Sequence, residues 1–77
     1  MRILSRNVRG LGKAKKRQIV RNVIASQKVD LIIIQETKWK NVTERLVSQV
    51  WGSGDFKWVA VESEGSSGGL ICIWNPE

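Results

Sequence analysis

The residue types best suited to chemistry in this chain are an amide, Asn7, and a carboxylate, Glu36. Asn7 closes a short strand-like stretch near the N-terminus, and Glu36 follows the apolar run at residues 31–34. The oxygen atoms of a carboxylate and an amide are hard ligands, which suit Mg²⁺ or Mn²⁺ better than zinc. The pair therefore indicates a site for a divalent metal and a phosphate, with Glu36 as the metal ligand.

The other acidic residues that fall at element ends have simpler explanations. Asp30 lies at the opposite end of the apolar run, Glu44 belongs to a helix-capping sequence and Asp55 lies in a turn. For Glu36 and Asn7 there is also an alternative, in which Glu36 caps the following turn and Asn7 hydrogen-bonds a loop. The end of a strand favours a functional role without requiring one, so spacing alone leaves both interpretations open.

The composition excludes several kinds of site. The chain has no histidine and a single cysteine, Cys72. A histidine general base, a Ser-His or Cys-His nucleophile pair and a zinc centre of histidines or several thiolates therefore cannot be built from these residues. The lone cysteine cannot form an internal disulfide, and no apolar run approaches the roughly 18–20 residues of a membrane span. We expect an intracellular location, nucleus or cytoplasm, and no membrane association.

The candidate residues require a βαβ unit to bring them together. Residues 2–8 read as a strand, residues 13–28 have a helical period, and residues 29–35 contain a continuous apolar run typical of a strand in a parallel sheet. Because parallel strands end at the same edge of a sheet, we expect Asn7 and Glu36 to be neighbours there.

The second half of the chain predicts one more helix and two more strands. Asn41 and Glu44 have the spacing of a capping box, the helix follows, and Gly52 ends it. Residues 56–62 and 69–74 read as strands that pair in an antiparallel hairpin. The expected fold is one small α/β domain with the order β-α-β-α-β-β.

The chain is strongly basic, with 13 Lys and Arg against 7 Asp and Glu and a formal net charge of +6. This excess favours an anionic partner, of which nucleic acid is the commonest. The candidate contacts open the first predicted helix and are Lys13, Lys15, Lys16 and Arg17. A solvated basic face is the alternative, because basic runs are nonspecific signals.

The four tryptophans divide into two groups. Trp51, Trp58 and Trp74 fall on the helical stripe or in strands, and core packing is expected for them. Trp39 lies in the loop after Glu36, which makes it the candidate for stacking on bases.

Two segments carry a family resemblance. Residues 1–12 read Met-Arg-Ile-Leu-Ser-Arg-Asn-Val-Arg-Gly-Leu-Gly, and residues 31–37 read Leu-Ile-Ile-Ile-Gln-Glu-Thr. They resemble the first two motifs of the endonuclease/exonuclease/phosphatase family. With residues 56–61 and 67–74, the chain is similar to the N-terminal part of the endonuclease domain of plant LINE-type (non-LTR) retrotransposons.

This resemblance implies a four-layered α/β sandwich, of which residues 1–77 form an N-terminal fragment. It implies that Glu36 is the Mg²⁺ (or Mn²⁺) ligand and that Asn7 orients the scissile phosphate or a metal-bound water in a DNA-nicking phosphodiesterase. The family also uses further Asp, Asn and Tyr residues and a late His-Asp pair, none of which can be matched here. The chain alone is therefore expected to bind metal weakly or not at all and to be inactive.

One departure from the family pattern affects packing. Arg6 stands where the family usually has tryptophan, and alternation places it on the same face as Leu4 and Val8. That face is expected to be buried, where an unpaired guanidinium would cost several kcal/mol. Relaxed selection or an open sheet face would explain the arginine.

The sequence leaves two alternatives to the phosphodiesterase open: a non-catalytic basic module that binds nucleic acid, and a non-functional retroelement remnant.

Overall fold

The computed structural model describes all 77 residues of the chain. The order of elements is β-α-β-α-β-β, as the sequence predicts. The elements are β1 (Ile3–Asn7), α1 (Ala14–Gln27), β2 (Leu31–Gln35), α2 (Glu44–Trp51), β3 (Lys57–Val61) and β4 (Leu70–Trp74). No helix in the structure combines the length and the apolar character needed to cross a membrane.

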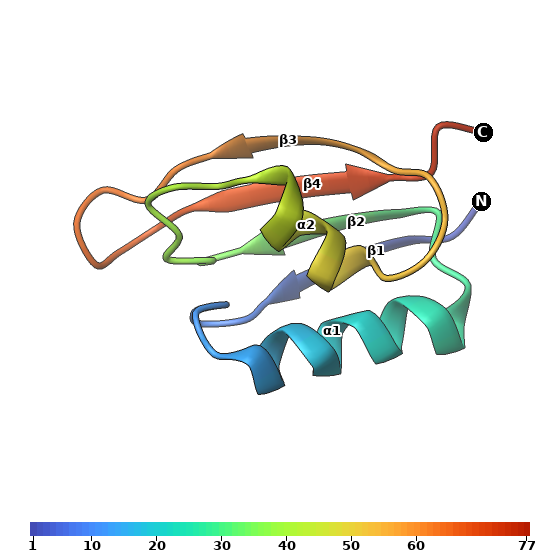
Figure 1. The fold of residues 1–77 in the computed structure, drawn as a ribbon, viewed down its shortest axis with the longest axis horizontal. Coiled ribbons are helices and arrows are strands. Elements are labelled where there is room, and N and C mark those ends of the chain that lie inside the picture. The colour runs from blue at the N-terminus through green and yellow to red at the C-terminus, as the bar shows by residue number, and fades with distance from the viewer.

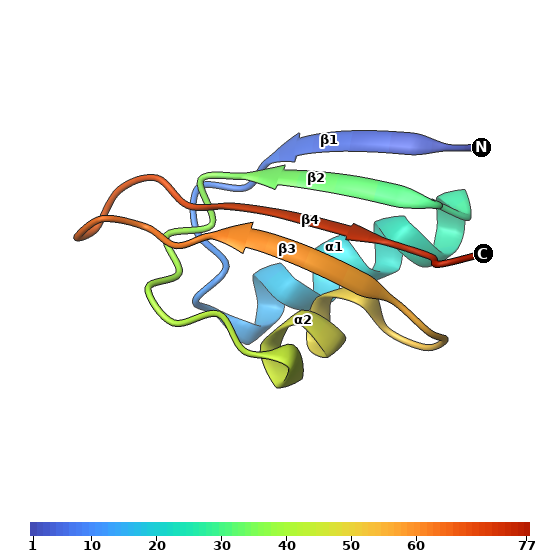
Figure 2. The ribbon, with the colours of Figure 1, turned by 90° about the horizontal axis from the view of Figure 1, so that it is seen from above.

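The four strands form one sheet in the order β1-β2-β4-β3 (Figures 1 and 2). Strands β1 and β2 are parallel, with Asn7 opposite Gln35, so their carboxyl ends are level. The expected antiparallel hairpin of β3 and β4 is present. Strand β4 also pairs antiparallel with β2, which places the last strand inside the sheet. The loops after β1, β2 and β3 therefore meet at one edge, opposite the two chain termini (Figure 1).

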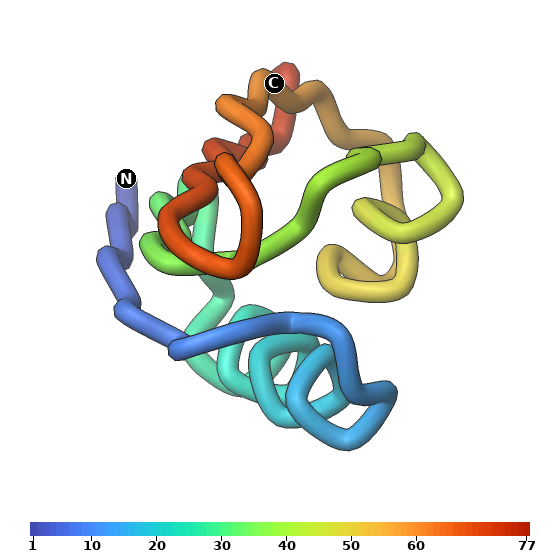
Figure 3. The backbone as a smooth tube through the Cα atoms, turned by 90° about the vertical axis from the view of Figure 1, so that its left-hand side faces the viewer, coloured from blue at the N-terminus to red at the C-terminus, as the bar shows by residue number.

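Both helices cover the same face of the sheet, and the core lies between the two layers (Figures 2 and 3). Alternate residues of the central strands supply its floor, which is fully buried: Ile32, Ile34, Ile71 and Ile73. The helices contribute Val20 and Ile24 from α1 and Val47, Val50 and Trp51 from α2. The side chains that alternate with the floor face away from the helices, and several of them are exposed: Ile3, Val59, Val61 and Leu70.

The start of α2 differs from the expected capping box. Thr43, not Asn41, is the N-cap, and its Oγ1 accepts a hydrogen bond of 3.3 Å from the Leu46 amide. The preceding chain is held by another contact, because the Val42 amide donates to Glu62 Oε2 at 3.1 Å. The helix therefore begins two residues later than predicted, and Glu44 opens its first turn instead of closing a capping box.

Arg6 is exposed, so the expectation that it is buried is wrong. Strand β1 is at the edge of the sheet, where α1 does not cover its whole inner face. A groove of about 270 Å³ remains between the strand and the helix. Arg6 lies at this groove beside five apolar residues: Val8, Ile19, Val20, Val23 and Ile32. The Arg6 guanidinium is therefore hydrated, and the apolar surface beside it is partly exposed to solvent.

Candidate functional site

Asn7 and Glu36 lie together at the carboxyl edge of the parallel pair β1–β2. The Asn7 side-chain amide, Nδ2, donates a hydrogen bond to Glu36 Oε2. Asn7 is the last residue of β1, and Glu36 is the first residue after β2. The level ends of the two strands account for this meeting of residues 29 positions apart in the sequence. The geometry agrees with the expected neighbourhood, while the catalytic and metal-binding roles of both residues remain predictions.

The segment that carries Glu36 is fixed by backbone hydrogen bonds on both sides. On one side, the amides of Gly10 and Leu11 donate to the carbonyls of Glu36 and Thr37 at 2.7 and 2.9 Å. On the other side, the amides of residues 37 and 38 donate to the carbonyls of Gly69 and Gly68 at 3.2 and 2.9 Å. The loop after β2 therefore lies between the loop after β1 and the β3–β4 loop. This arrangement orders the Glu36 backbone without a contribution from its side chain.

The same edge contains an uncommon concentration of left-handed backbone. Arg9, Glu36 and Lys38 have φ values of 54°, 56° and 58°. Residues other than glycine rarely adopt such angles, and each instance costs about 1–3 kcal/mol when the residue is not in a favourable turn. The hydrogen bonds on both sides of residues 36–38 hold Glu36 and Lys38 in these conformations. Such strained positions cluster at functional sites in proteins, which supports a role for this edge.

The donor atoms at this edge suit a hard divalent cation but supply few of its ligands. With Nδ2 of Asn7 directed to Oε2 of Glu36, the second carboxylate oxygen and the amide oxygen remain as oxygen ligands. Nowhere in the structure do three or more His, Cys, Asp or Glu side chains form a group that could hold a metal ion. Magnesium commonly binds through one or two carboxylates and keeps several waters. The two residues therefore fit one side of an open Mg²⁺ or Mn²⁺ site.

The four predicted nucleic-acid contacts differ in their surroundings. Arg17 is held by internal hydrogen bonds, from Nη1 to the Leu11 carbonyl at 2.8 Å and from Nε to Gln49 Oε1 at 2.9 Å. It thus joins the loop before α1 to helix α2. Lys15 is exposed on the surface of α1. Lys13 and Lys16, in contrast, face a common hollow at the start of the helix.

Two further cations line that hollow and were not singled out from the sequence. Arg9 follows Asn7 by two residues, and Lys38 follows Glu36 by two residues. Both lie in the loops that follow β1 and β2, and both line the hollow together with Lys13 and Lys16. Their position just beyond the ends of two parallel strands was the available signal, because such loops commonly form binding sites.

Two of the four tryptophans, Trp39 and Trp74, do not lie where the sequence predicts. Trp39 is 7% exposed and belongs to the core, so its suggested contact with bases is wrong. Its loop folds inward, with the Ser63 amide donating to the Trp39 carbonyl at 2.8 Å. Trp51 is buried and Trp58 packs against the core, as predicted. Trp74 is half-buried, but it alternates with Ile73 and so lies on the face away from the helices.

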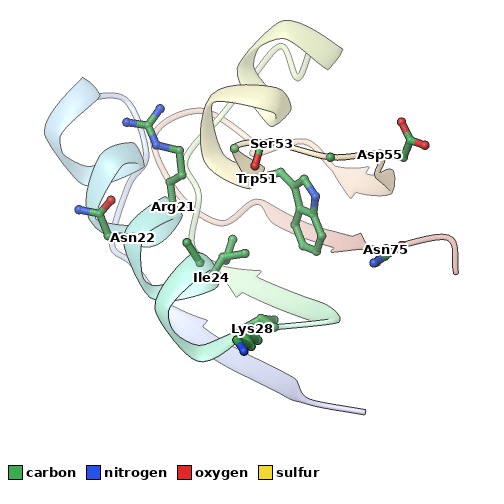
Figure 4. A pocket seen from close by; sticks show the side chains of 12 residues that line it. Arg21, Asn22, Ile24, Lys28, Trp51, Ser53, Asp55 and Asn75 are labelled. Carbon is green, nitrogen blue, oxygen red and sulfur yellow. The ribbon is translucent and has the colours of Figure 1, made fainter.

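A separate hollow of about 410 Å³ lies at the opposite edge of the sheet, between the second half of α1 and the loop after α2. Figure 4 shows the Trp51 ring at its centre, with Lys28 and Asn75 nearby. Arg21 and Asp55 also line it, so its charges are mixed. Neither Asn7 nor Glu36 lines this hollow, and it has no connection with the candidate chemistry.

Comparison with solved structures identifies an AP endonuclease as a structural neighbour. The crystal structure of the AP endonuclease LMAP from Leishmania major matches with a TM-score of 0.63 and 25% sequence identity. The match covers 92% of this chain and 22% of that chain, so these 77 residues correspond to a minor part of the neighbour. No model of a protein family and no curated protein sequence matches the chain. The fold is therefore that of a fragment of an AP endonuclease-like, nuclease-type α/β structure.

Proposed function

We propose that Asn7 and Glu36 form the opening part of a Mg²⁺- or Mn²⁺-dependent phosphodiesterase site that acts on DNA. The observation that carries this proposal is the hydrogen bond between the two side chains at the shared carboxyl edge of β1 and β2. The structural neighbour is an AP endonuclease, and this supports a nuclease as the parent activity. The net charge of +6 favours DNA as the partner.

The two residues have complementary tasks in such a site. A divalent metal, when bound, polarises a phosphate and stabilises the leaving oxygen. The Glu36 carboxylate offers the charged oxygen ligand, and the fixed backbone on both sides of it limits its movement. The Asn7 amide orients that carboxylate through Nδ2, while its own oxygen is available to hold a water or to orient the scissile phosphate. No histidine is present to activate the water.

Several finer assignments belong to the same proposal. The resemblance in the motifs favours the endonuclease domain of a plant LINE-type retrotransposon, with residues 1–77 as its N-terminal fragment. A DNA-nicking enzyme of this kind would act inside the cell, in the nucleus or the cytoplasm. The fragment alone would lack catalytic activity, because one carboxylate and one amide do not both bind the metal and activate water.

A second candidate function is supported by a separate observation. The hollow lined by Arg9, Lys13, Lys16 and Lys38 has no acidic side chain in its wall. Such a surface suits a non-catalytic module that binds nucleic acid through phosphate contacts. If the chain is a non-functional remnant of a retroelement, neither the metal site nor the basic hollow needs to bind a ligand.

A chimeric enzyme tests the proposed function. Residues 1–77 would replace the matching segment of the Leishmania major AP endonuclease, and folding would be verified first by circular dichroism and thermal melting. We expect Mg²⁺-dependent DNA cleavage that falls at least about 100-fold with Glu36→Gln, because a metal ligand contributes several kcal/mol to the transition state. Asp55→Asn, at the opposite edge, is the matched control and should leave cleavage unchanged. A folded chimera whose cleavage survives Glu36→Gln would contradict the proposal.

A further inference from the structure

The hollow beside the candidate pair is lined only by basic side chains and glycines. Its volume is about 390 Å³, and its wall consists of Arg9, Gly10, Gly12, Lys13, Lys16 and Lys38. No carboxylate and no apolar side chain takes part. Four cationic side chains line this hollow with no acidic side chain among them, so an anion that enters it would relieve their mutual repulsion.

The cations come from three segments whose relative positions are fixed. The Gly10 amide donates to the Glu36 carbonyl at 2.7 Å, and this bond holds the Arg9 loop against the loop that carries Lys38. Gly10 has a φ of 107°, and a side chain there would lie 3.6 Å from Cδ of Lys38. The stem of Lys38 therefore lies close to Gly10, and the Lys38 side chain lines the hollow.

Helix α1 supplies the opposite wall. The Lys16 ammonium donates a hydrogen bond to the Val8 carbonyl, so the side chain lies back over the loop after β1. An ammonium group has three N–H donors, and two of them remain for a ligand. Lys13 precedes the first turn of α1, and no acidic residue in that turn neutralises it. The bond to the Val8 carbonyl thus holds Lys16 at the hollow despite the repulsion between the neighbouring cations.

We propose that this hollow binds the terminal phosphate of a nucleic-acid strand, a phosphomonoester at a strand end. A phosphomonoester carries a charge of about −1.5 to −2 at neutral pH, compared with −1 for an internal phosphodiester. A compact group of four cations favours the ligand with the greater charge. The absence of apolar side chains from the wall argues against a lipid headgroup, whose acyl chains would lie against it. The inference that the phosphate belongs to a nucleic-acid strand rests on the proposed function. The inference that the hollow binds a phosphate group does not.

The test compares two short single-stranded DNA oligonucleotides that differ only at the 5′ end, one phosphorylated and one with a hydroxyl. Both carry a fluorophore at the 3′ end, and binding is measured by fluorescence anisotropy with EDTA present. We expect the phosphorylated strand to bind about five times more tightly, the factor for one further charge at contact distance in a hydrated site. Inorganic phosphate at millimolar concentration should remove the difference.

Variants identify the hollow as the source of the preference. Arg9→Gln and Lys38→Gln should each reduce it to about threefold, because each removes one of the four charges, and the double variant should reduce it to about twofold. Lys38→Arg keeps the charge and should keep the preference. Lys15→Gln, on the exposed surface of α1, is the matched control and should lower binding of both strands equally. Folding of each variant would be verified by its two-dimensional amide NMR spectrum.

Equal affinity of the unchanged protein for the two strands would overturn the assignment to a strand end. A preference that survives both Arg9→Gln and Lys38→Gln would overturn the assignment to this hollow. Competition by inorganic phosphate without any preference between the strands would identify a free-phosphate site, and it too would contradict the proposal. Because EDTA removes divalent metals, these results do not depend on whether Glu36 binds a metal.

Discussion

The side-chain amide of Asn7 donates a hydrogen bond to Oε2 of Glu36 across the carboxyl edge of two parallel strands. Neither residue is near the other in sequence, and the sheet register alone brings them together. The loop that carries Glu36 is bonded on both sides to neighbouring loops. The arrangement therefore positions an amide and a carboxylate before any ligand is bound, which is the condition for a preorganised site.

Arg6→Trp should stabilise the fold. The indole would cover the apolar groove between β1 and α1, where Ile19 is 52% exposed. Burial of this surface should add about 1–2 kcal/mol to the free energy of unfolding and raise Tm by about 4–8 °C per kcal/mol. Urea unfolding followed by circular dichroism would measure the change, with Arg2→Trp outside the groove as the control. Easier unfolding or self-association of the Arg6 variant would show that the groove does not accept the indole.

Gly69→Ala should destabilise the site edge. An added Cβ would clash with Thr37 Oγ1 and lie 3.1 Å from the Lys38 amide nitrogen, at a φ of 91°. We expect a loss of about 2–4 kcal/mol from overpacking and left-handed strain. Gly12→Ala is the control, since an added Cβ there meets nothing within 4 Å. Similar stabilities of the two variants in thermal melting would contradict the described contact between the loops.

DNA binding should be weak, independent of sequence and steeply reduced by salt. Lys13→Ala and Lys16→Ala should each lower the slope of log affinity against log salt by about one, because each removes a phosphate contact. Arg17→Ala should act mainly on stability, since Arg17 bonds Leu11 and Gln49. Anisotropy titrations between 20 and 200 mM salt (roughly the range where phosphate contacts are screened) would separate these effects. Absence of DNA binding at low salt would show that the basic residues at the start of α1 form only a solvated surface.

The isolated chain should not cleave DNA. One carboxylate and one amide supply part of a metal site, and no histidine is present to activate water. Supercoiled plasmid incubated with the purified chain and Mg²⁺ should remain supercoiled on an agarose gel, whereas an intact AP endonuclease on abasic plasmid provides the positive control. Nicking that disappears with Glu36→Ala would refute this prediction.

Local patterns in the sequence were enough to predict the order of the elements. The continuous apolar run of β2 and the change of period at α1 indicate a βαβ unit, and a parallel unit places Asn7 beside Glu36. The position of β4 between β2 and β3 could not be predicted in this way. Strand order depends on which edges are free when the sheet assembles, and the residue types of β4 suit several positions.

The errors concern residues whose surroundings come from distant parts of the chain. Asn41 has the residue type of an N-cap, but Thr43 takes that position, and the Val42 amide before it is bonded to the distant Glu62. Trp39 follows the candidate site in sequence, yet its loop folds into the core. Arg6 shares a face of β1 with Leu4 and Val8, which pack against the core, but it lies on an edge strand that α1 covers only in part. Each outcome depends on tertiary contacts that a local pattern does not contain.

Paramagnetic NMR with Mn²⁺ tests most directly whether Asn7 and Glu36 form one metal site. Mn²⁺ broadens the amide signals of nearby residues, so substoichiometric addition maps even a weak site. We predict broadening at residues of both the β1 and the β2 ends, including Asn7 and Glu36, that is lost with Glu36→Gln and kept with Asp55→Asn. Broadening confined to other carboxylates, or unchanged broadening in the Glu36→Gln variant, would contradict the account.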